Sequence, residues 1–171
     1  MAESVKGKAD GELEYLMVEV ESWRSARDRH EVLSTRGLGS GLGISVFDPD
    51  LHLGGVLHAP LPLSIHHPDL AESSPDLFVD TAVTAVFDNF FAHGGRRSRM
   101  EVKVAGGSVP KLSDDLFRIG EKNLRVLEKI FAKNEIEVSA HCVGGTQSLR
   151  MRLHLDTGRV VLSSGSEEWD L

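Results

Sequence analysis

Apolar residues alternate with polar ones in several separate stretches of this chain of 171 residues. The clearest stretch is 149–155, where Leu and Met occupy every second position and Arg and His fill the gaps. Successive side chains of a strand face opposite sides of a sheet, so this pattern predicts a half-buried strand. Residues 159–162 follow an Asp-Thr-Gly turn and can return as its hairpin partner. The same alternation predicts strands over 42–46, 100–104 and 136–140.

Two further stretches repeat their apolar residues at helical spacing. One follows Ser74 and Pro75, which are typical of a helix start, and ends at the glycine pair 94–95. Its apolar face consists of Val79, Ala82, Val83, Val86, Phe87 and Phe90. The other runs from about Gly120 to Lys133, with Leu124, Leu127, Ile130 and Phe131 on one side. Strands combined with two amphipathic helices predict an α+β fold whose helices cover sheet faces.

The length favours one domain, since chains of roughly 100–200 residues usually form one. We expect a flexible leader over residues 1–12, a single domain over 13–162 and a flexible acidic tail over 163–171. The first residues lack the apolar segment of a signal peptide, and no apolar run approaches the roughly 18–20 residues that a membrane span needs. These features predict a cytoplasmic protein without membrane insertion.

Composition excludes several kinds of function. The formal net charge is −7 and no dense basic cluster is visible, which argues against nucleic-acid binding. The single cysteine excludes an intrachain disulfide and a CxxC metal or redox site. His66 and His67 stand together but have no further ligand at metal spacing, so we expect neither a metal nor a cofactor.

The most unusual segment is a glycine-rich turn over residues 34–44. A phosphate-binding loop would have a lysine after the glycines, and a dinucleotide fingerprint would continue into a helix. Here no lysine follows, and an alternating strand pattern comes next. Glycines that lead into a strand indicate a tight backbone turn whose N–H groups can line a small site.

This turn opens an ordered series of motifs. Thr35, Leu38, Gly39 and Ser40 match a Thr-x-x-Leu-Gly-Ser-Cys pattern, and residues 58–62 match a His-x-x-Leu-Pro segment. Further matches follow at 47–49, 78–80, 103–108, 119–123, 144–145 and 157–158. Over residues 32–162 the chain therefore resembles the CheD family, the chemoreceptor glutamine deamidases of bacterial chemotaxis.

The resemblance implies a fold, a reaction and partners. The fold would be a four-layer α/β/β/α arrangement with mixed sheets. A Cys thiolate would attack the side-chain amide of a receptor glutamine, His58 would activate it, and Thr35 would orient His58. Backbone N–H groups of the turn would hold the oxyanion, and the substrate would lie against Gly39, Ser40, Gly106 and Gly107. The partners implied are the cytoplasmic helices of chemoreceptors and a CheC-type phosphatase.

One departure from the family pattern bears directly on catalysis. Gly41 occupies the position at which the pattern has its nucleophilic cysteine. Glycine cannot form a thioester, and loss of a nucleophile costs about a millionfold in rate, roughly 8 kcal/mol of barrier. We therefore expect deamidation to be lost or very weak, which leaves a regulatory role in binding receptors or the phosphatase.

Three alternatives would keep the chain active. Ser40 is adjacent, although neighbouring side chains of an extended segment point to opposite faces. Cys142 could act as a displaced thiol beside His141 or His58, although a free cysteine is more often simply buried. A water activated by His58 is the third. A different possibility is an unrelated small-molecule binding protein that reuses the fold.

Overall fold

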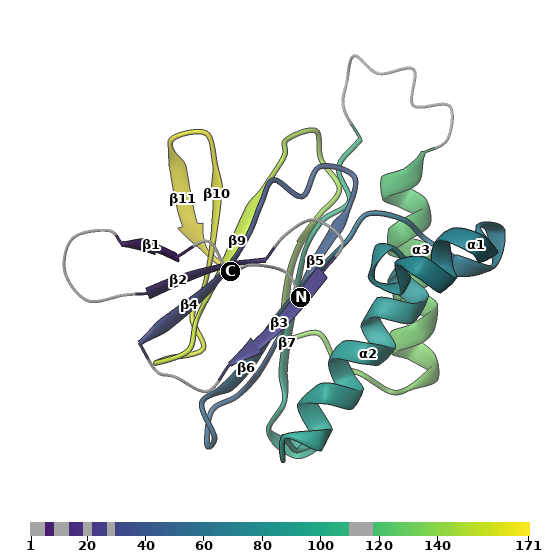
Figure 1. Cartoon of the computed structure of the whole chain (residues 1–171). Helices are drawn as coiled ribbons and strands as arrows, with labels where there is room; N and C mark the ends of the chain where they lie inside the picture. The colour runs from purple at the N-terminus through teal and green to yellow at the C-terminus, as the bar shows by residue number, and fades with distance from the viewer. Residues whose placement is uncertain (1–5, 9–13, 19–21, 27–29, 110–117) are drawn as a thin grey trace.

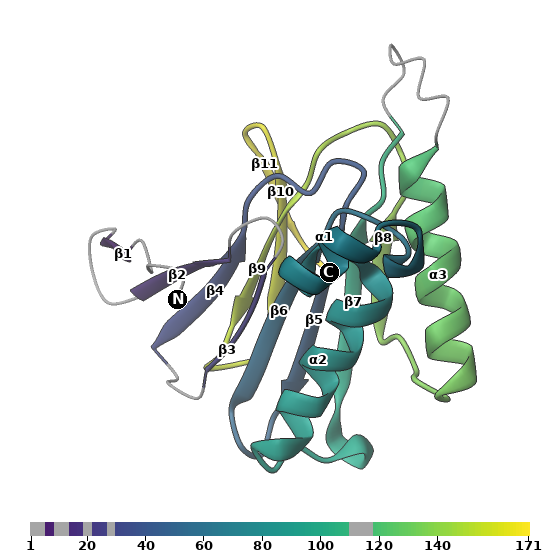
Figure 2. The same cartoon turned by 45° about the vertical axis from the view of Figure 1, so that its right-hand side comes forward.

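Two β-sheets packed face to face form the centre of the molecule, and helices cover the outer face of one of them (Figures 1 and 2). The computed structural model describes residues 6–8, 14–18, 22–26, 30–109 and 118–171.

The helix-covered sheet has five strands in the order β3-β6-β5-β7-β8. Their bounds are Ser22–Ala26 for β3, Leu42–Asp48 for β5, Leu53–Ala59 for β6, Glu101–Gly106 for β7 and Ala140–Val143 for β8. All neighbours pair antiparallel except β7 and β8, which are parallel. One row of residues across the sheet reads His58, Gly43, Ala105 and Cys142. This row matters for the site described below.

The second sheet has six strands in the order β1-β2-β4-β9-β10-β11. The bounds are Lys6–Lys8, Glu14–Val18 and Glu31–Thr35 for β1, β2 and β4, then Arg150–His154, Val160–Ser164 and Glu167–Asp170 for β9, β10 and β11. Strands β2 and β4 are parallel and the other pairs are antiparallel.

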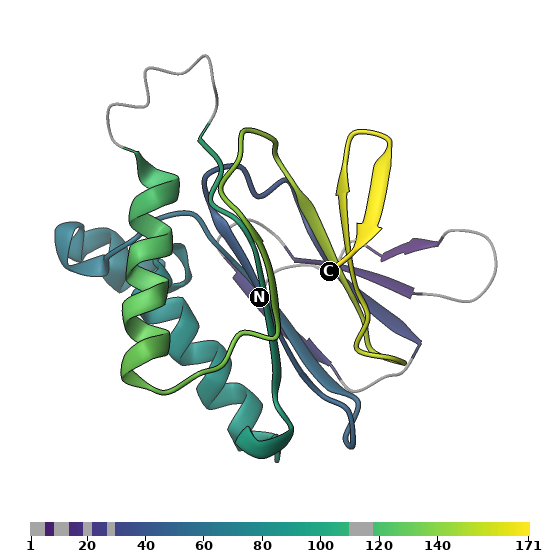
Figure 3. The same cartoon turned by 180° about the vertical axis from the view of Figure 1, so that it is seen from behind.

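All helices of the described residues lie on the free side of the five-stranded sheet (Figures 1 and 3). The two long ones are α2 (Val79–Ala92) and α3 (Ile119–Lys133). The short ones are α1 (Pro68–Ser73) and three 3-10 turns, η1 (Ser64–His66), η2 (Pro75–Leu77) and η3 (Arg97–Arg99).

Two hydrophobic layers explain why β5 and β6 are buried along their whole length. Alternate residues such as Ile44 and Leu57 pack against α2 and α3. The residues between them, such as Phe47 and Val56, pack against Leu33 and Leu153 of the six-stranded sheet. A strand covered on both faces loses its polar face, so these two central strands contain few polar side chains.

The α+β class and the mixed sheets are confirmed. The described residues form three layers, however, and no helix among them covers the outer face of the six-stranded sheet, where the four-layer arrangement would have one. The reason is that the apolar faces of both long helices are buried in the same cluster against the five-stranded sheet.

The chain ends and two element boundaries differ from the expectation. Residues 167–170 form β11, which pairs with β10, and Trp169 packs against the core between the sheets, so the acidic segment is an edge strand. Lys6–Lys8 of the expected leader forms β1. The strand expected at 136–140 lies at 140–143. Helix α2 begins at Val79 because the buried, extended Phe78 separates it from η2, and Ser74 does not cap it.

A buried ion pair fixes the end of β5. The Asp48 carboxylate is fully buried and accepts hydrogen bonds from Arg99 Nε at 2.9 Å and Nη2 at 2.6 Å. It also accepts the backbone N–H groups of Asp50, Leu51 and Arg96. Burial acts to raise the pKa of Asp48, but the Arg99 and backbone donors outweigh it and hold that pKa below its usual range. Asp48 therefore joins the β5–β6 turn to the segment after α2.

No helix among the described residues is both long enough and apolar enough to span a bilayer.

Candidate functional site

The glycine-rich turn joins β4 to β5, which places it where the chain passes from one sheet to the other (Figure 1). Its backbone is tied on one side to the loop before β9. Leu38 N donates to Leu149 O at 2.7 Å, and Gly39 N donates to Ser148 Oγ at 3.2 Å. Within the turn, Gly41 N donates to Leu38 O at 2.8 Å. The amides of Gly39 and Gly41 are thus already used, so neither is free to hold an oxyanion in this conformation.

The end of β7 holds the turn from a second side. Gly107 N donates to Gly41 O at 2.8 Å, and Ser108 N donates to Gly39 O at 2.9 Å. Gly106 has a φ of +98°, and a Cβ there would lie 2.3 Å from Gly41 O, so only glycine permits this approach. Gly106 and Gly107 are buried, whereas Gly39 and Ser40 are partly exposed. Gly106 at the end of β7 and Gly107 directly after it therefore position the turn. Of the four residues expected to contact substrate, only Gly39 and Ser40 lie where a partner can reach.

Helix α3 holds the turn from a third side through Asn123. Its side-chain Nδ2 donates to Ser40 O and to Pro60 O, both at 2.9 Å, and the residue is fully buried. One amide thus connects the turn to the middle of the His-x-x-Leu-Pro segment. The sequence interpretation did not assign Asn123 a role. The sequence does contain a signal for this role, because Asn123 is a single polar residue on the apolar side of an amphipathic helix.

His58 lies on β6 and faces the layer between the two sheets, like Val56 two residues earlier. A Cβ built on Gly41 would lie 2.8 Å from His58 Nε2 and 3.0 Å from Leu38 O. The φ of Gly41 is not in the left-handed region, so its backbone accepts a side chain. Gly41 and His58 are therefore in contact, and the imidazole fills the space that a side chain at position 41 would need.

Burial makes His58 a neutral imidazole. The side chain is 2% exposed, and this burial lowers its pKa below 6.5, against the opposing effect of a hydrogen bond to the Leu38 backbone. Its Nδ1 has no hydrogen-bond partner among the described residues. A buried ring nitrogen without a hydrogen-bond partner costs about 1–3 kcal/mol of stability. Packing alone does not explain a histidine here, because an apolar side chain would pack without this cost.

Thr35 lies at the end of β4 and is fully buried, but it does not hydrogen-bond His58. Its hydroxyl accepts the Met151 N–H at 2.9 Å and donates weakly to Met151 O at 3.5 Å. In this structure Thr35 extends the pairing of β4 with β9. The expected hydrogen bond that would orient the imidazole is not formed.

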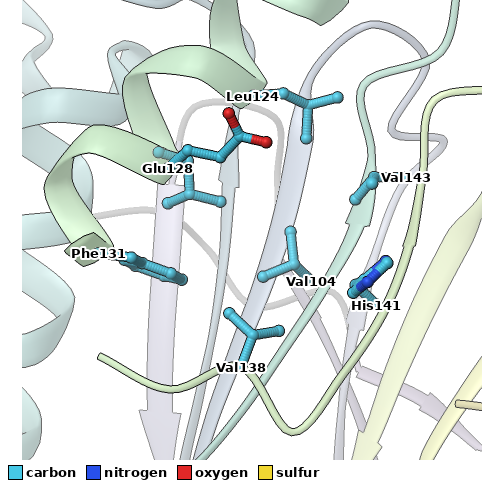
Figure 4. A pocket seen from close by; sticks show the side chains of 8 residues that line it. Val104, Leu124, Glu128, Phe131, Val138, His141 and Val143 are labelled. Atoms are coloured by element: carbon cyan, nitrogen blue, oxygen red, sulfur yellow. The ribbon is translucent and has the colours of Figure 1, made fainter. Parts of the chain in front are cut away.

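Cys142 lies far from His58. Both belong to the row of the five-stranded sheet that also contains Gly43 and Ala105, three strand spacings or about 14 Å apart. Cys142 packs against the core between the sheets. Its neighbour His141 faces the opposite side, into a hollow of about 300 Å³ between β8 and α3 that Glu128 also lines (Figure 4). The thiol is therefore beside neither imidazole.

Comparison of the sequence with known proteins places the chain in a family. Residues 61–164 match the family model described as CheD chemotactic sensory transduction. The chain is 37% identical over 140 residues to a probable chemoreceptor glutamine deamidase CheD 2 of Anaeromyxobacter dehalogenans, covering 82% of this chain and 88% of the relative. The chain belongs to the CheD family. A CheD 1 protein of Syntrophus aciditrophicus, also named a probable chemoreceptor glutamine deamidase, is 32% identical over 149 residues, covering 87% and 93% of the two chains.

The region matched by the CheD family model does not include the glycine turn or His58. The family model covers residues 61–164, so it begins after His58 and leaves out the glycine turn. A probable CheD deamidase of Solibacter usitatus is nevertheless 33% identical over 159 residues, covering 93% of this chain and 94% of the relative. Membership of the CheD family thus does not depend on the residues whose chemistry is in question.

We expect His58 to make the stability of this CheD protein depend on pH. The pKa of His58 is lowered in the folded state, so the unfolded state takes up the proton first as the pH falls below 6.5. Between pH 7.5 and 5.5 the free energy of unfolding should fall because of this residue, by at most about 1.4 kcal/mol. Urea titrations at the two pH values should show a smaller decrease for His58→Gln.

His66→Gln is the matched control, since His66 is exposed in η1. Its pH dependence should equal that of the parent protein. If His58→Gln keeps the full decrease, His58 does not carry a depressed pKa.

Proposed function

We propose that this CheD-family protein binds the cytoplasmic helices of chemoreceptors, or a CheC-type phosphatase, and regulates them without deamidating glutamine. The observation that supports the loss of catalysis best is the contact between Gly41 and His58. At the position expected to supply the thiol there is no side chain, and the place of a Cβ is 2.8 Å from the imidazole. We infer that the protein acts in the cytoplasm, where the receptor helices are.

The alternatives for the nucleophile receive little support from the geometry. Cys142 is three strands from His58, and its thiol packs in the layer between the sheets. Ser40 precedes Gly41, whose Cβ direction points at His58, so the Ser40 side chain is directed elsewhere. His58 itself is 2% exposed, which leaves its ring little access to substrate or bulk water.

The intact surroundings of Gly41 favour a binding role over simple loss of function. Asn123, Gly107 and Ser108 still hold the turn with hydrogen bonds of 2.8–2.9 Å, and Gly106 and Gly107 keep conformations that other residues would strain. A surface that retains this order can still recognise a receptor or a phosphatase.

The proposal is tested with a receptor signalling fragment and with a CheC-type phosphatase. We expect one of them to bind the purified protein, as measured by calorimetry. We also expect no Gln→Glu mass increase of about one dalton in the receptor above the uncatalysed background. Absence of binding to both would refute the binding role. A mass increase that thiol alkylation abolishes would instead identify Cys142 as a nucleophile.

A further inference from the structure

The exposed side of α3 carries cations along its whole length. Lysine and arginine recur three or four residues apart, which places them on one face of a helix. We call this set the cationic stripe, and it consists of Arg118, the residue directly before α3, and of Lys122, Arg125, Lys129 and Lys133 within the helix. All five side chains are exposed. The helix has 15 residues, so the stripe is about 22 Å long.

The cationic stripe is largely unneutralised. Within the part of the chain that the structure describes, an ion pair is found only for Arg118, which pairs with Glu121. The other acidic residue of α3, Glu128, lies on the side that faces β8 (Figure 4). The formal net charge of the chain is −7, so five cations on one helix face are a local reversal of its overall sign.

A cavity of about 400 Å³ lies beside the cationic stripe, between α3 and the segment that follows β6. Its apolar lining comes from residues 61–63 and from Ile119 and Val126 of α3. The same segment continues to Ile65, whose side chain is 77% exposed and is the most exposed large hydrophobic residue of the described chain. Leu70 in the following helix is 40% exposed. Apolar surface is therefore available next to the cations.

The polar lining of this cavity is entirely basic. It consists of His66 and His67 on one side and Lys122 and Arg125 of the cationic stripe on the other. By contrast, the hollow beside β8 includes Glu128, and the hollow between α2 and α3 includes Asp88. The chemistry that fits an apolar floor with a basic rim is a segment that is apolar on one side and acidic on the other.

We propose that the cationic stripe and the adjoining cavity form a docking surface for an acidic amphipathic helix of a partner protein. The acidic side of that helix lies along Lys122, Arg125 and Lys129, and its apolar side enters the cavity and contacts Ile65. A helix suits the straight stripe, and the apolar cavity favours it over nucleic acid, which offers a phosphate backbone alone. The inference rests on the proposed function for the identity of the partner.

The position of the surface connects it to the glycine turn. Lys122 is followed by Asn123, which holds Ser40 O and Pro60 O. The cavity lining begins at Leu61, directly after Pro60. A partner helix seated on α3 therefore lies next to the site built from Gly41 and His58.

The test uses the full chain and two probes, a receptor signalling fragment and a synthetic amphipathic peptide with Glu on one side and Leu on the other. The peptide has about 20 residues, enough to hold a helix in water. The double variant Lys122→Glu/Arg125→Glu should bind each probe at least about tenfold more weakly than the parent protein, and the salt dependence of binding should fall.

The matched control is Arg96→Glu/Arg97→Glu, which changes the net charge equally at two exposed positions after α2. We expect its affinity to stay within about twofold of the parent value. Ile65→Ser tests the apolar half of the surface, with Val138→Ser at a less exposed position as its control. Ile65→Ser should weaken binding at least about fivefold, because exposed apolar residues at the centre of an interface often dominate its affinity.

The outcomes separate this inference from the proposed function. If the receptor fragment binds the parent protein and both charge variants equally, the docking surface is refuted while the proposed function stands. If the peptide binds through the stripe but neither receptor nor phosphatase does, the docking surface stands and the proposed function fails. If anionic vesicles or duplex DNA bind more tightly than the peptide and depend on the same lysine and arginine, the assignment to a protein helix is wrong.

Discussion

Replacing Gly41 by cysteine is expected to raise receptor-glutamine deamidation by at least about 100-fold over the parent protein, the scale of an activated catalytic group. A Cβ at this position lies against His58 Nε2, and the backbone accepts a side chain there. The crowding would break the hydrogen bond between the ring and the Leu38 backbone, which frees the neutral imidazole to take the thiol proton and create the thiolate that attacks an amide. The measurement is the mass increase of about one dalton in a receptor fragment over time.

The same substitution should lower stability by about 1–3 kcal/mol, because the 2.8 Å approach forces the buried His58 ring to move. Gly41→Ala is the matched control, since it imposes the same crowding without a thiol. The alanine variant should be destabilised equally and remain inactive. A folded Gly41→Cys protein with an alkylatable thiol but no deamidation would contradict the expectation. It would mean that the missing oxyanion donors or the unused Thr35 hydroxyl also limit the chemistry.

Replacing Asp48 by alanine is expected to cost about 3–4 kcal/mol of the free energy of unfolding. The change removes the partner of Arg99 and leaves the backbone N–H groups of Leu51 and Arg96 without their acceptor. The pKa of Asp48 is held below 3.8 in the folded protein, so this stabilisation is present above that pH. It should be lost as the pH falls below 3.8. Urea titration at pH 7 and pH 3 measures both effects.

Asp50→Ala provides the comparison for Asp48. Asp50 also pairs with Arg99, at 3.1 Å, but its side chain is 68% exposed. Exposed ion pairs contribute about 0–1 kcal/mol, so the Asp50 variant should unfold close to the parent protein. Equal losses for the two variants would show that Asp48 does not anchor the end of β5.

The sequence predicted the elements whose side chains divide clearly between two environments. Strands β7, β9 and β10 and helices α2 and α3 each have a predominantly apolar side and were predicted within a few residues. The doubly covered β5 was also predicted, from the alternation of its larger apolar residues. Strand β11 was missed because three of its four residues are acidic or exposed, and only Trp169 packs inward. Its pairing with β10 depends on backbone hydrogen bonds that composition does not reveal.

The candidate site was predicted in its parts but not in its connections. His58 and Gly41 were paired through the family pattern, and they are in contact. That Thr35 bonds Met151, and that Cys142 is three strands from His58, depends on sheet order, which distant residues decide.

The cationic stripe was overlooked because its residues are separated along the chain and gather only once α3 forms. Consecutive basic residues are easier to see in the sequence, as at 96–99, but there Arg99 is the partner of Asp48.

The Asn123 side chain couples three segments of the chain mechanically, because it extends from α3 and donates to two backbone carbonyls in other segments. It holds together α3, the residue before Gly41, and Pro60, the residue directly after the strand that carries His58. A displacement of α3 would therefore act at the same time on the segment that contains Gly41 and on the segment that follows His58. A small tilt of α3 would change the distance between the His58 imidazole and the glycine-rich turn. We therefore expect a partner that shifts α3 to change the distance between Gly41 and His58.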